Sequence, residues 1–85
     1  MQLLQDFELA VVKSKELPQK PDNETLLKLY SLYKQATVGD CEEKPVTNFF
    51  DFVAKFKQEA WCKLAGTTKE NAMQQYIDVI TALKN

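Results

Sequence analysis

The 85-residue chain contains no histidine and no arginine, and each absence argues against a kind of chemistry. Histidine is the commonest general base and the commonest metal ligand, so a catalytic or metal site is not expected. Arginine binds a phosphate through two parallel hydrogen bonds, whereas lysine supplies a compact point charge. All 11 cationic side chains are lysines. We therefore predict a protein that is no enzyme and holds no cofactor or metal, and any phosphate site must use lysine.

Glycine, proline and long hydrophobic runs are also scarce. The chain has 2 glycines and 3 prolines, which argues against a turn-rich β fold. It lacks the run of about 18 apolar residues that would be needed to span a membrane. The net charge is −1, so nothing directs the chain to nucleic acid. We expect one domain over residues 1–85, monomeric, with no nucleic-acid partner and no stable membrane insertion.

Cys41 and Cys62 lack the CxxC spacing of a redox or metal motif. The start of the chain, residues 1–6, lacks the basic segment and the apolar run of a signal peptide. Both observations favour a reducing compartment, where disulfides are rare. We expect a cytoplasmic protein with two free thiols.

Apolar residues recur at helical spacing in four segments, and no segment alternates as a strand would. The segments predict helices over about residues 3–17, 23–37, 49–64 and 68–83. Residues 40–48 between the second and third helices show no periodicity and are long enough to span a bundle. The fold class is therefore all-α: a four-helix bundle with a long connection between helices two and three.

Four signals set the expected helix ends. Pro18 ends the first helix, because proline disfavours helical geometry in the residue before it. Asp22 is the expected N-cap of the second helix, and Gly39 its stop. The sequence from Thr67 to Glu70 indicates a capping box at the start of the fourth helix, with Thr67 as the N-cap.

The third helix concentrates its apolar residues on one broad half. With these residues in a core, the pattern leaves no large apolar surface unexplained, which weighs against a protein–protein interaction module. The residues of this half are Phe49, Phe52, Val53, Phe56, Ala60, Trp61 and Leu64.

Tyr30, Tyr33 and Lys34 stand at positions i, i+3 and i+4 of the second helix, so they share one part of its surface. Two phenol rings and an ammonium group can stack a flat ring and hold an anion. The alternative is that the tyrosines are half-buried core residues and the lysine is surface charge. Helical projection puts Tyr33 deepest in the apolar stripe, with Tyr30 and Lys34 on its flank.

Lys57 has only apolar residues at i±3 and i±4 on the third helix. An unpaired buried ammonium is costly, so its head either reaches water past Trp61 or faces an anion. Tyr76 falls in the apolar stripe of the fourth helix, where its ring is expected to pack and its hydroxyl to reach the edge. Lysines and tyrosines beside apolar stripes suit a ligand with a phosphorylated, ring-bearing head and an apolar tail.

The sequence resembles the acyl-CoA-binding protein family over nearly its whole length. The strongest motif is the run from Tyr30 to Asp40, YSLYKQATVGD. Shorter pieces follow it in matching order: Pro45, Phe52, Lys57, Ala60-Trp61, Leu64, Gly66 to Glu70, Ala72-Met73 and Tyr76-Ile77.

The resemblance implies an up-down-down-up bundle that binds medium- to long-chain acyl-CoA esters without catalysis. Carried over by position, Tyr30, Tyr33 and Lys34 hold the CoA head and Lys57 meets its phosphates. Tyr76 lies at the adenine end. Lys15 is a weaker contact, and Leu26 and Leu27 line the acyl chain.

Two family-typical positions differ here: Gln58 replaces a common aromatic residue, and Phe56 a small or polar one. These departures leave the chain-length preference open. The resemblance implies intracellular transport or buffering of acyl-CoA, with acyl-CoA-using enzymes or membranes as transient donors and acceptors. An interaction module remains an alternative, as does the acyl-CoA-binding domain of a larger lipid-metabolism protein.

Overall fold

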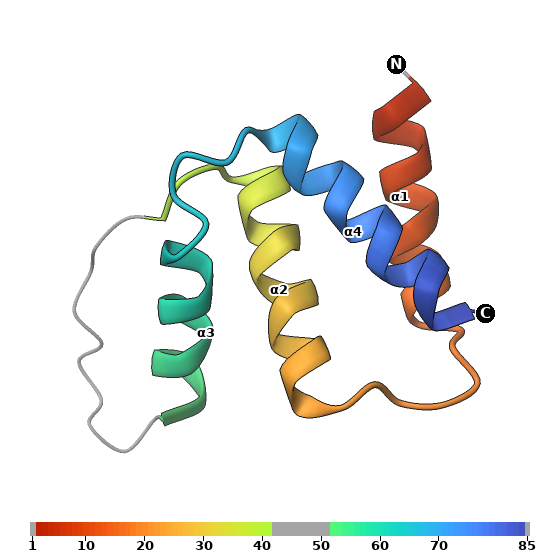
Figure 1. Ribbon diagram of the computed structural model, residues 1–85, viewed down its shortest axis with the longest axis horizontal. Helices are drawn as coiled ribbons and strands as arrows, with labels where there is room; N and C mark the ends of the chain where they lie inside the picture. Colours follow the sequence, from red (N-terminus) through yellow and green to blue (C-terminus); the bar gives the residue numbers. More distant parts are fainter. Residues whose placement is uncertain (1, 42–51, 85) are drawn as a thin grey trace.

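The computed structural model describes residues 2–41 and 52–84, and this part of the chain is entirely helical apart from its connections. In Figure 1, α1 and α4 run in one direction while α2 and α3 run in the other. This order confirms the predicted all-α, up-down-down-up bundle. The helices are α1 (Gln2–Ser14), α2 (Asn23–Thr37), α3 (Phe52–Cys62) and α4 (Lys69–Lys84).

Helices α2 and α4 form the centre of the packing. Helix α4 contacts α1 and α2, whereas α2 contacts α4 and α3, and α3 lies beside α2 alone among the described helices (Figure 1). The buried apolar side chains all come from α1, α2 and α4. Each large one contributes about 1.5–3 kcal/mol when fully buried. They are Phe7, Ala10, Leu29, Leu32, Ala36, Ala72, Tyr76 and Ile80. None of the described helices is long and apolar enough to cross a membrane.

The ends of α2 agree with the sequence prediction. The Asp22 carboxylate accepts a hydrogen bond from the backbone N–H of Thr25 at 2.8 Å, which satisfies one of the free donors at the helix start. At the other end the backbone N–H of Gly39 donates to the Lys34 carbonyl at 3.3 Å. Gly39 has φ of +99°, a conformation that glycine adopts without steric cost. The motif from Tyr30 to Asp40 thus lies on α2 and the turn that follows it.

Helix α1 ends at Ser14, three residues before the predicted Leu17. The Ser14 hydroxyl donates to the Val11 carbonyl at 2.6 Å, and the backbone N–H of Lys15 donates to the Val12 carbonyl at 3.1 Å. Bonds to the third preceding residue tighten the last turn and close the α-helical pattern. Proline at position 18 also has no N–H with which to continue that pattern.

The predicted N-cap of α4 is wrong by one residue. The Thr68 hydroxyl, and not that of Thr67, accepts from the backbone N–H of Asn71 at 3.1 Å. Thr67 still belongs to the preceding turn, because its N–H donates to the Leu64 carbonyl at 2.9 Å. With Thr68 as the N-cap, Glu70 no longer stands at the position that a capping box requires.

Helix α3 buries none of its residues, which contradicts the expectation that its apolar half belongs to a core. Phe52, Val53 and Phe56 are 61%, 63% and 57% exposed. The physical reason is that, among the described helices, α3 packs against α2 alone, so only part of its surface is covered. The sequence argument against an interaction module therefore loses its basis. Phe49 and most of the 40–48 connection lie outside the described residues.

Candidate functional site

A hollow with a volume of about 260 Å³ opens between α1, α2 and α4. Five of the eight predicted binding residues line it: Lys15, Leu26, Tyr30, Tyr33 and Tyr76. They come from three helical regions that are far apart in the sequence, so the fold brings them together. The remaining lining residues are Val11, Ser14, Pro21 and Leu29. The hollow thus combines three phenol rings, one lysine and aliphatic side chains.

Lys57 of α3 does not line this hollow, but it contacts Tyr30, one of the residues that do. Its ammonium nitrogen Nζ lies 5.1 Å from the centre of the Tyr30 ring, within the range of a cation–π contact. The Lys57 side chain is exposed, so the ammonium group remains hydrated. The sequence offered two positions for this group, in water past Trp61 or facing an anion. The head is hydrated, as the first alternative has it, but it lies over the Tyr30 ring, where an anion could also reach it.

Lys34 of α2 makes a similar cation–π contact with an aromatic ring of α3. Its Nζ atom lies 5.6 Å from the centre of the Trp61 ring, so α2 and α3 each supply one lysine and one aromatic ring to their shared boundary. Lys34 is half-buried but is not among the residues that line the hollow. Leu27 is also half-buried on α2 and outside the lining. Lys34, Leu27 and Lys57 are thus the three predicted residues that do not line the hollow.

The burial predicted from the helical projection is right for Tyr76 and wrong for Tyr33. Tyr76, whose ring was expected to pack, is 4% exposed, whereas Tyr33, expected deepest in the stripe, is 41% exposed. Phe7 of α1 packs against both rings. Its ring centre lies 6.0 Å from that of Tyr33 and 5.2 Å from that of Tyr76, edge-on to the latter. Residue spacing within α2 carries no information on which side chains of α1 pack against it, so the contacts of Phe7 with the two tyrosines were not predicted.

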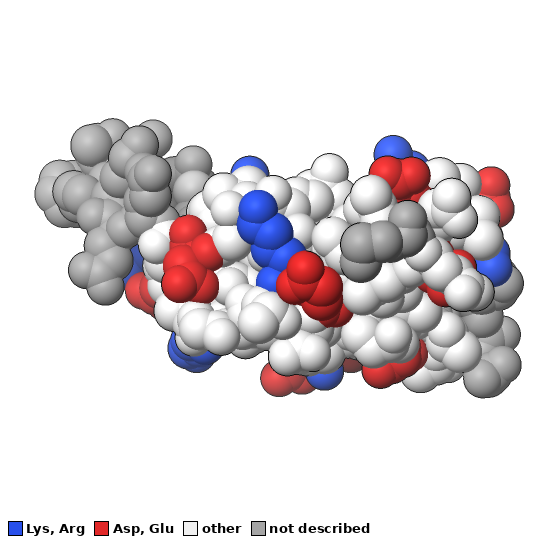
Figure 2. Space-filling model, turned by 90° about the horizontal axis from the view of Figure 1, so that it is seen from above, with Lys and Arg blue, Asp and Glu red and all other residues white. Residues whose placement is uncertain are grey.

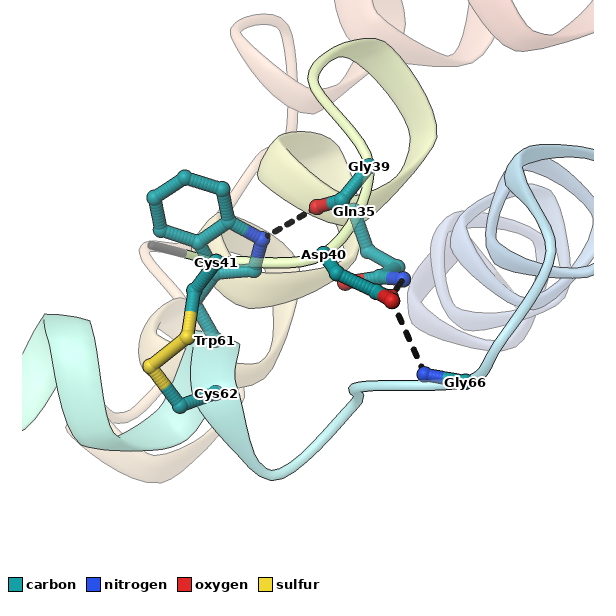
Figure 3. The surroundings of a disulfide bond; sticks show 7 residues. All are labelled: Gln35, Gly39, Asp40, Cys41, Trp61, Cys62 and Gly66. Carbon is teal, nitrogen blue, oxygen red and sulfur yellow. Dashed lines mark hydrogen bonds between the residues drawn. A yellow bond between two sulfur atoms is a disulfide. The ribbon is translucent and has the colours of Figure 1, made fainter. Parts of the chain in front are cut away.

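Gln35 and Asp40, both within the YSLYKQATVGD motif, hold α2 against the segment that begins α4 (Figure 3). The Gln35 side-chain amide donates to the Asp40 carboxylate at 2.8 Å and to the Thr67 carbonyl at 2.7 Å. The same carboxylate oxygen accepts from the Gly66 backbone N–H at 3.0 Å. The Gln35 hydrogen bond first, and that of Gly66 second, lower the pKa of the Asp40 carboxyl. Part of the motif therefore has a structural role, because it connects α2 to the segment before α4. The spacing of the motif residues in the sequence did not predict this role.

Cys41 and Cys62 form a disulfide, so the prediction of two free thiols is wrong, and the cysteines no longer support the expectation of a reducing compartment. Their Cα atoms lie 5.1 Å apart, a separation that suits this bond. Beside it, the Trp61 indole N–H donates to the Gly39 carbonyl at 2.8 Å (Figure 3). The 21-residue separation between the cysteines gave no sign of this proximity, because the α2–α3 packing that creates it is a tertiary contact.

Two other hollows are larger but chemically less suited to a phosphorylated ligand. One of about 490 Å³ shares Val11 and Tyr33 with the first and carries Glu8 and Lys69. The other, of about 370 Å³, lies between α1 and α4 and has Asp6 and Lys13 as its charged residues. Each sets a carboxylate beside its lysine, and neither has more than one tyrosine. We therefore take the hollow lined by Lys15 and three tyrosines as the candidate site and call it the tyrosine hollow.

The charge distribution gives no broad basic surface on the face drawn in Figure 2, where acidic and basic side chains are interspersed. Within residues 2–41 and 52–84, no group of three or more acidic or cysteine side chains is placed to hold a metal ion. The fold and the tyrosine hollow together define a small helical binding domain. Its ligand should carry a flat ring, negative charge and an apolar part.

Comparison with known proteins identifies the family. The family model described as acyl CoA binding protein matches residues 4–80. The chain therefore belongs to the acyl-CoA-binding protein family, as its motifs indicated. The acyl-CoA-binding protein of Saccharomyces cerevisiae is 45% identical over 78 residues, which cover 91% of this chain and 87% of the yeast protein.

A solved structure and a longer relative add detail. The crystal structure of Oryza sativa acyl-CoA-binding protein 2 is 40% identical and matches with a TM-score of 0.86 over 95% of this chain and 89% of that one. Enoyl-CoA delta isomerase 2 of Rattus norvegicus is 47% identical over 81 residues. That match covers 95% of this chain but 20% of the isomerase, so the chain spans about a fifth of the length of that relative.

Proposed function

We propose that this chain binds medium- to long-chain fatty acyl-CoA esters without transforming them, and that it carries or buffers them in the cytoplasm. The tyrosine hollow is the observation that carries this proposal. Five of the predicted ligand residues line it, and the Lys57 ammonium lies over the ring of Tyr30, one of these five. Family membership agrees with the ligand class.

The CoA head supplies the phosphates and the adenine ring that this arrangement suits. A lysine about 4 Å from a phosphate charge gains roughly 1 kcal/mol in water and roughly 4 at an effective dielectric near 20. Lys57 is exposed and Lys34 half-buried, so both are nearer the first figure than the second. A base stacked on a tyrosine adds about 1–3 kcal/mol. Tyr30 and Tyr33 are partly exposed and can make this contact, whereas Tyr76 is 4% exposed and offers very little surface for it.

The acyl tail should supply most of the affinity. Each buried methylene contributes about 0.8 kcal/mol, so a 16-carbon tail could gain on the order of 10 kcal/mol before ordering costs. Leu26 lines the tyrosine hollow, and the half-buried Leu27 follows it on α2. The tail then distinguishes acyl-CoA from free CoA, while the lysines distinguish acyl-CoA from a fatty acid.

A second candidate is the acyl-CoA-binding domain of a larger lipid-metabolism protein. The match to a fifth of rat enoyl-CoA delta isomerase 2 favours it, because that relative shows the domain type within a longer chain. In this role the domain would bind the same ligand, and any catalysis would belong to another part of the protein. Enzymes that use acyl-CoA, or membranes, would serve as transient donors and acceptors in either case.

Native mass spectrometry of the 85-residue chain tests the proposal. Palmitoyl-CoA, free CoA and palmitate are each added to separate samples at equal concentration. We expect one palmitoyl-CoA per chain and much weaker adducts with the other two ligands. A chain that retains no palmitoyl-CoA would overturn the proposal and favour an interaction module instead.

A further inference from the structure

We propose that the Cys41–Cys62 disulfide positions α3 for ligand binding, so that the affinity for acyl-CoA depends on the redox state of this bond. The inference rests on the proposed function and adds a form of regulation to it. It starts from the attachment of α3, which carries Lys57 but buries none of its own residues. Among the described helices α3 contacts α2 alone.

A disulfide and a hydrogen bond attach the C-terminal end of α3 to the segment that follows α2. The disulfide joins Cys62, the last residue of α3, to Cys41 just after α2. The neighbouring Trp61 donates its indole N–H to the Gly39 carbonyl at 2.8 Å, two residues before Cys41 (Figure 3). The covalent bond and this hydrogen bond therefore fix the same corner between α2 and α3.

This corner is connected to both lysines of the α2–α3 boundary. The Trp61 ring that the corner holds lies under the Lys34 ammonium. Lys57 precedes Cys62 by five residues on the same rigid helix, and its ammonium lies over the Tyr30 ring. A helix transmits a tilt at one end along its length, so loosening the corner moves Lys57 relative to the tyrosine hollow.

The bond is accessible to a reductant, because both cysteines are only partly buried. A thiolate of a small dithiol attacks one sulfur and forms a mixed disulfide, and its second thiolate then displaces the protein sulfur. Two electrons and two protons pass to the protein, which ends with thiols at Cys41 and Cys62. The reductant leaves as its own disulfide.

The chain with the disulfide intact is more preorganised for acyl-CoA binding than the reduced chain. When α3 moves more freely, the arrangement that places Lys57 at the hollow is populated less, and apparent affinity falls in proportion. The corner also keeps the Trp61–Gly39 hydrogen bond after reduction, so the effect is partial. We expect reduction to weaken acyl-CoA binding by roughly three- to tenfold.

Isothermal titration with dodecanoyl-CoA tests the inference on the full chain. One sample is fully oxidised and one is reduced with excess dithiothreitol, with the thiol count of each checked by mass spectrometry. The double variant Cys41→Ser/Cys62→Ser is the matched control, since it should bind like the reduced chain and ignore dithiothreitol. Circular dichroism verifies that all samples are equally helical.

A second comparison separates a positioning role from general stabilisation. In Lys57→Ala, the group that the disulfide is proposed to position is missing, so the affinity ratio between oxidised and reduced forms should shrink towards one. Equal affinities of oxidised and reduced wild type, or an unchanged ratio in Lys57→Ala, would overturn the inference while leaving the proposed function intact. Failure of an oxidant to form the bond would also overturn it. Absence of binding in both states would overturn the proposed function as well.

Discussion

The ammonium nitrogen of Lys57 lies 5.1 Å from the centre of the Tyr30 ring, although the two residues are on different helices and 27 positions apart in the sequence. The contact links α3 to a residue of the tyrosine hollow, although no described residue of α3 lines the hollow itself. It places a hydrated positive charge over one of the aromatic rings that line a hollow with aliphatic side chains. A phosphorylated ligand with an apolar tail can use all three features together.

Lys57→Ala should weaken acyl-CoA binding about tenfold, which corresponds to roughly 1.4 kcal/mol. The loss follows from removing one phosphate-facing charge that is mostly hydrated. Binding of free dodecanoate should change much less. Lys55→Ala is the control, because Lys55 is an exposed lysine on the same helix. Calorimetry that gives equal losses for the ester and the fatty acid would contradict the assignment of Lys57 to the head group.

Lys34→Ala should also weaken acyl-CoA more than dodecanoate. Lys34 sits over Trp61 and outside the tyrosine hollow, so some of its effect should come from the α2–α3 boundary and not from the ligand. Urea unfolding of the same variant separates the two contributions. A variant that binds acyl-CoA like wild type would remove Lys34 from the site.

Tyr76→Ala and Tyr76→Phe should behave differently. Tyr76 is 4% exposed and packs edge-on against Phe7, so loss of the ring should cost about 3–5 kcal/mol of stability. Phenylalanine keeps that packing and removes only the hydroxyl. We expect near-native urea unfolding for Tyr76→Phe, with a loss of acyl-CoA affinity of about 0.5–1.5 kcal/mol if the hydroxyl contacts ligand. Unchanged affinity would assign Tyr76 to the core alone.

The helices were largely predictable because their signals are local. Hydrophobic periodicity located all four helices. The Asp22 cap and the Gly39 stop correctly predicted the first and last residues of α2. Two helix ends were predicted wrongly: the last residue of α1, which is Ser14, and the N-cap of α4, which is Thr68. At each end, neighbouring residues can make alternative hydrogen bonds of nearly equal energy. Local pattern does not decide between such alternatives.

The site was only partly predictable, because it depends on contacts between helices. The family motif selected Tyr30, Tyr33 and Tyr76, and the fold gathers them in one hollow. The burial of Tyr76 was predicted from its apolar stripe, but the 41% exposure of Tyr33 was not, because it depends on packing between helices. The disulfide and the exposed apolar residues of α3 were also not predicted, because they too depend on how the helices pack. Periodicity shows which residues of α3 could pack, but not how many neighbours the helix will have.

Acid should destabilise the chain through Asp40. Its hydrogen bonds from Gln35 and Gly66 hold the pKa of its carboxyl below the usual 3.8 in the folded state. A carboxylate with a lowered folded pKa stabilises the fold above its unfolded pKa, and that stability is lost as pH falls through the folded value. The melting temperature should therefore be flat from about pH 7 to pH 5 and fall below about pH 4.

Asp40→Asn is the variant that isolates this effect. It keeps an acceptor oxygen but removes the charge, so the melting temperature should be lower at neutral pH and should fall less steeply in acid. Asp22 also has a lowered pKa, because Thr25 donates to it, and its contribution remains in the variant. Differential scanning fluorimetry across this pH range provides the comparison. Parallel curves for wild type and variant would show that Asp40 is not responsible.

Gly66→Ala should destabilise the chain by about 1–2 kcal/mol through the backbone alone. Gly66 has φ of +92°, and a Cβ atom there would meet nothing within 4 Å, so no steric clash contributes. Gly39→Ala should cost a similar amount, because its Cβ would make only an ordinary contact with Lys69 at 3.5 Å. Urea unfolding measures both. A neutral or stabilising Gly66→Ala would contradict the left-handed turn at this position.

Chemical-shift mapping of the ¹⁵N-labelled chain with dodecanoyl-CoA tests the central claim most directly. The ligand should shift the amide signals around the tyrosine hollow, and we expect the largest changes at Lys15, Leu26, Tyr30, Tyr33 and Lys57. The hollow between α1 and α4, which Leu9, Lys13 and Thr81 line, serves as the internal control and should change little. Saturable shifts confined to the tyrosine hollow and to Lys57 are the predicted result. Shifts centred on the control hollow, or none at all, would contradict the account.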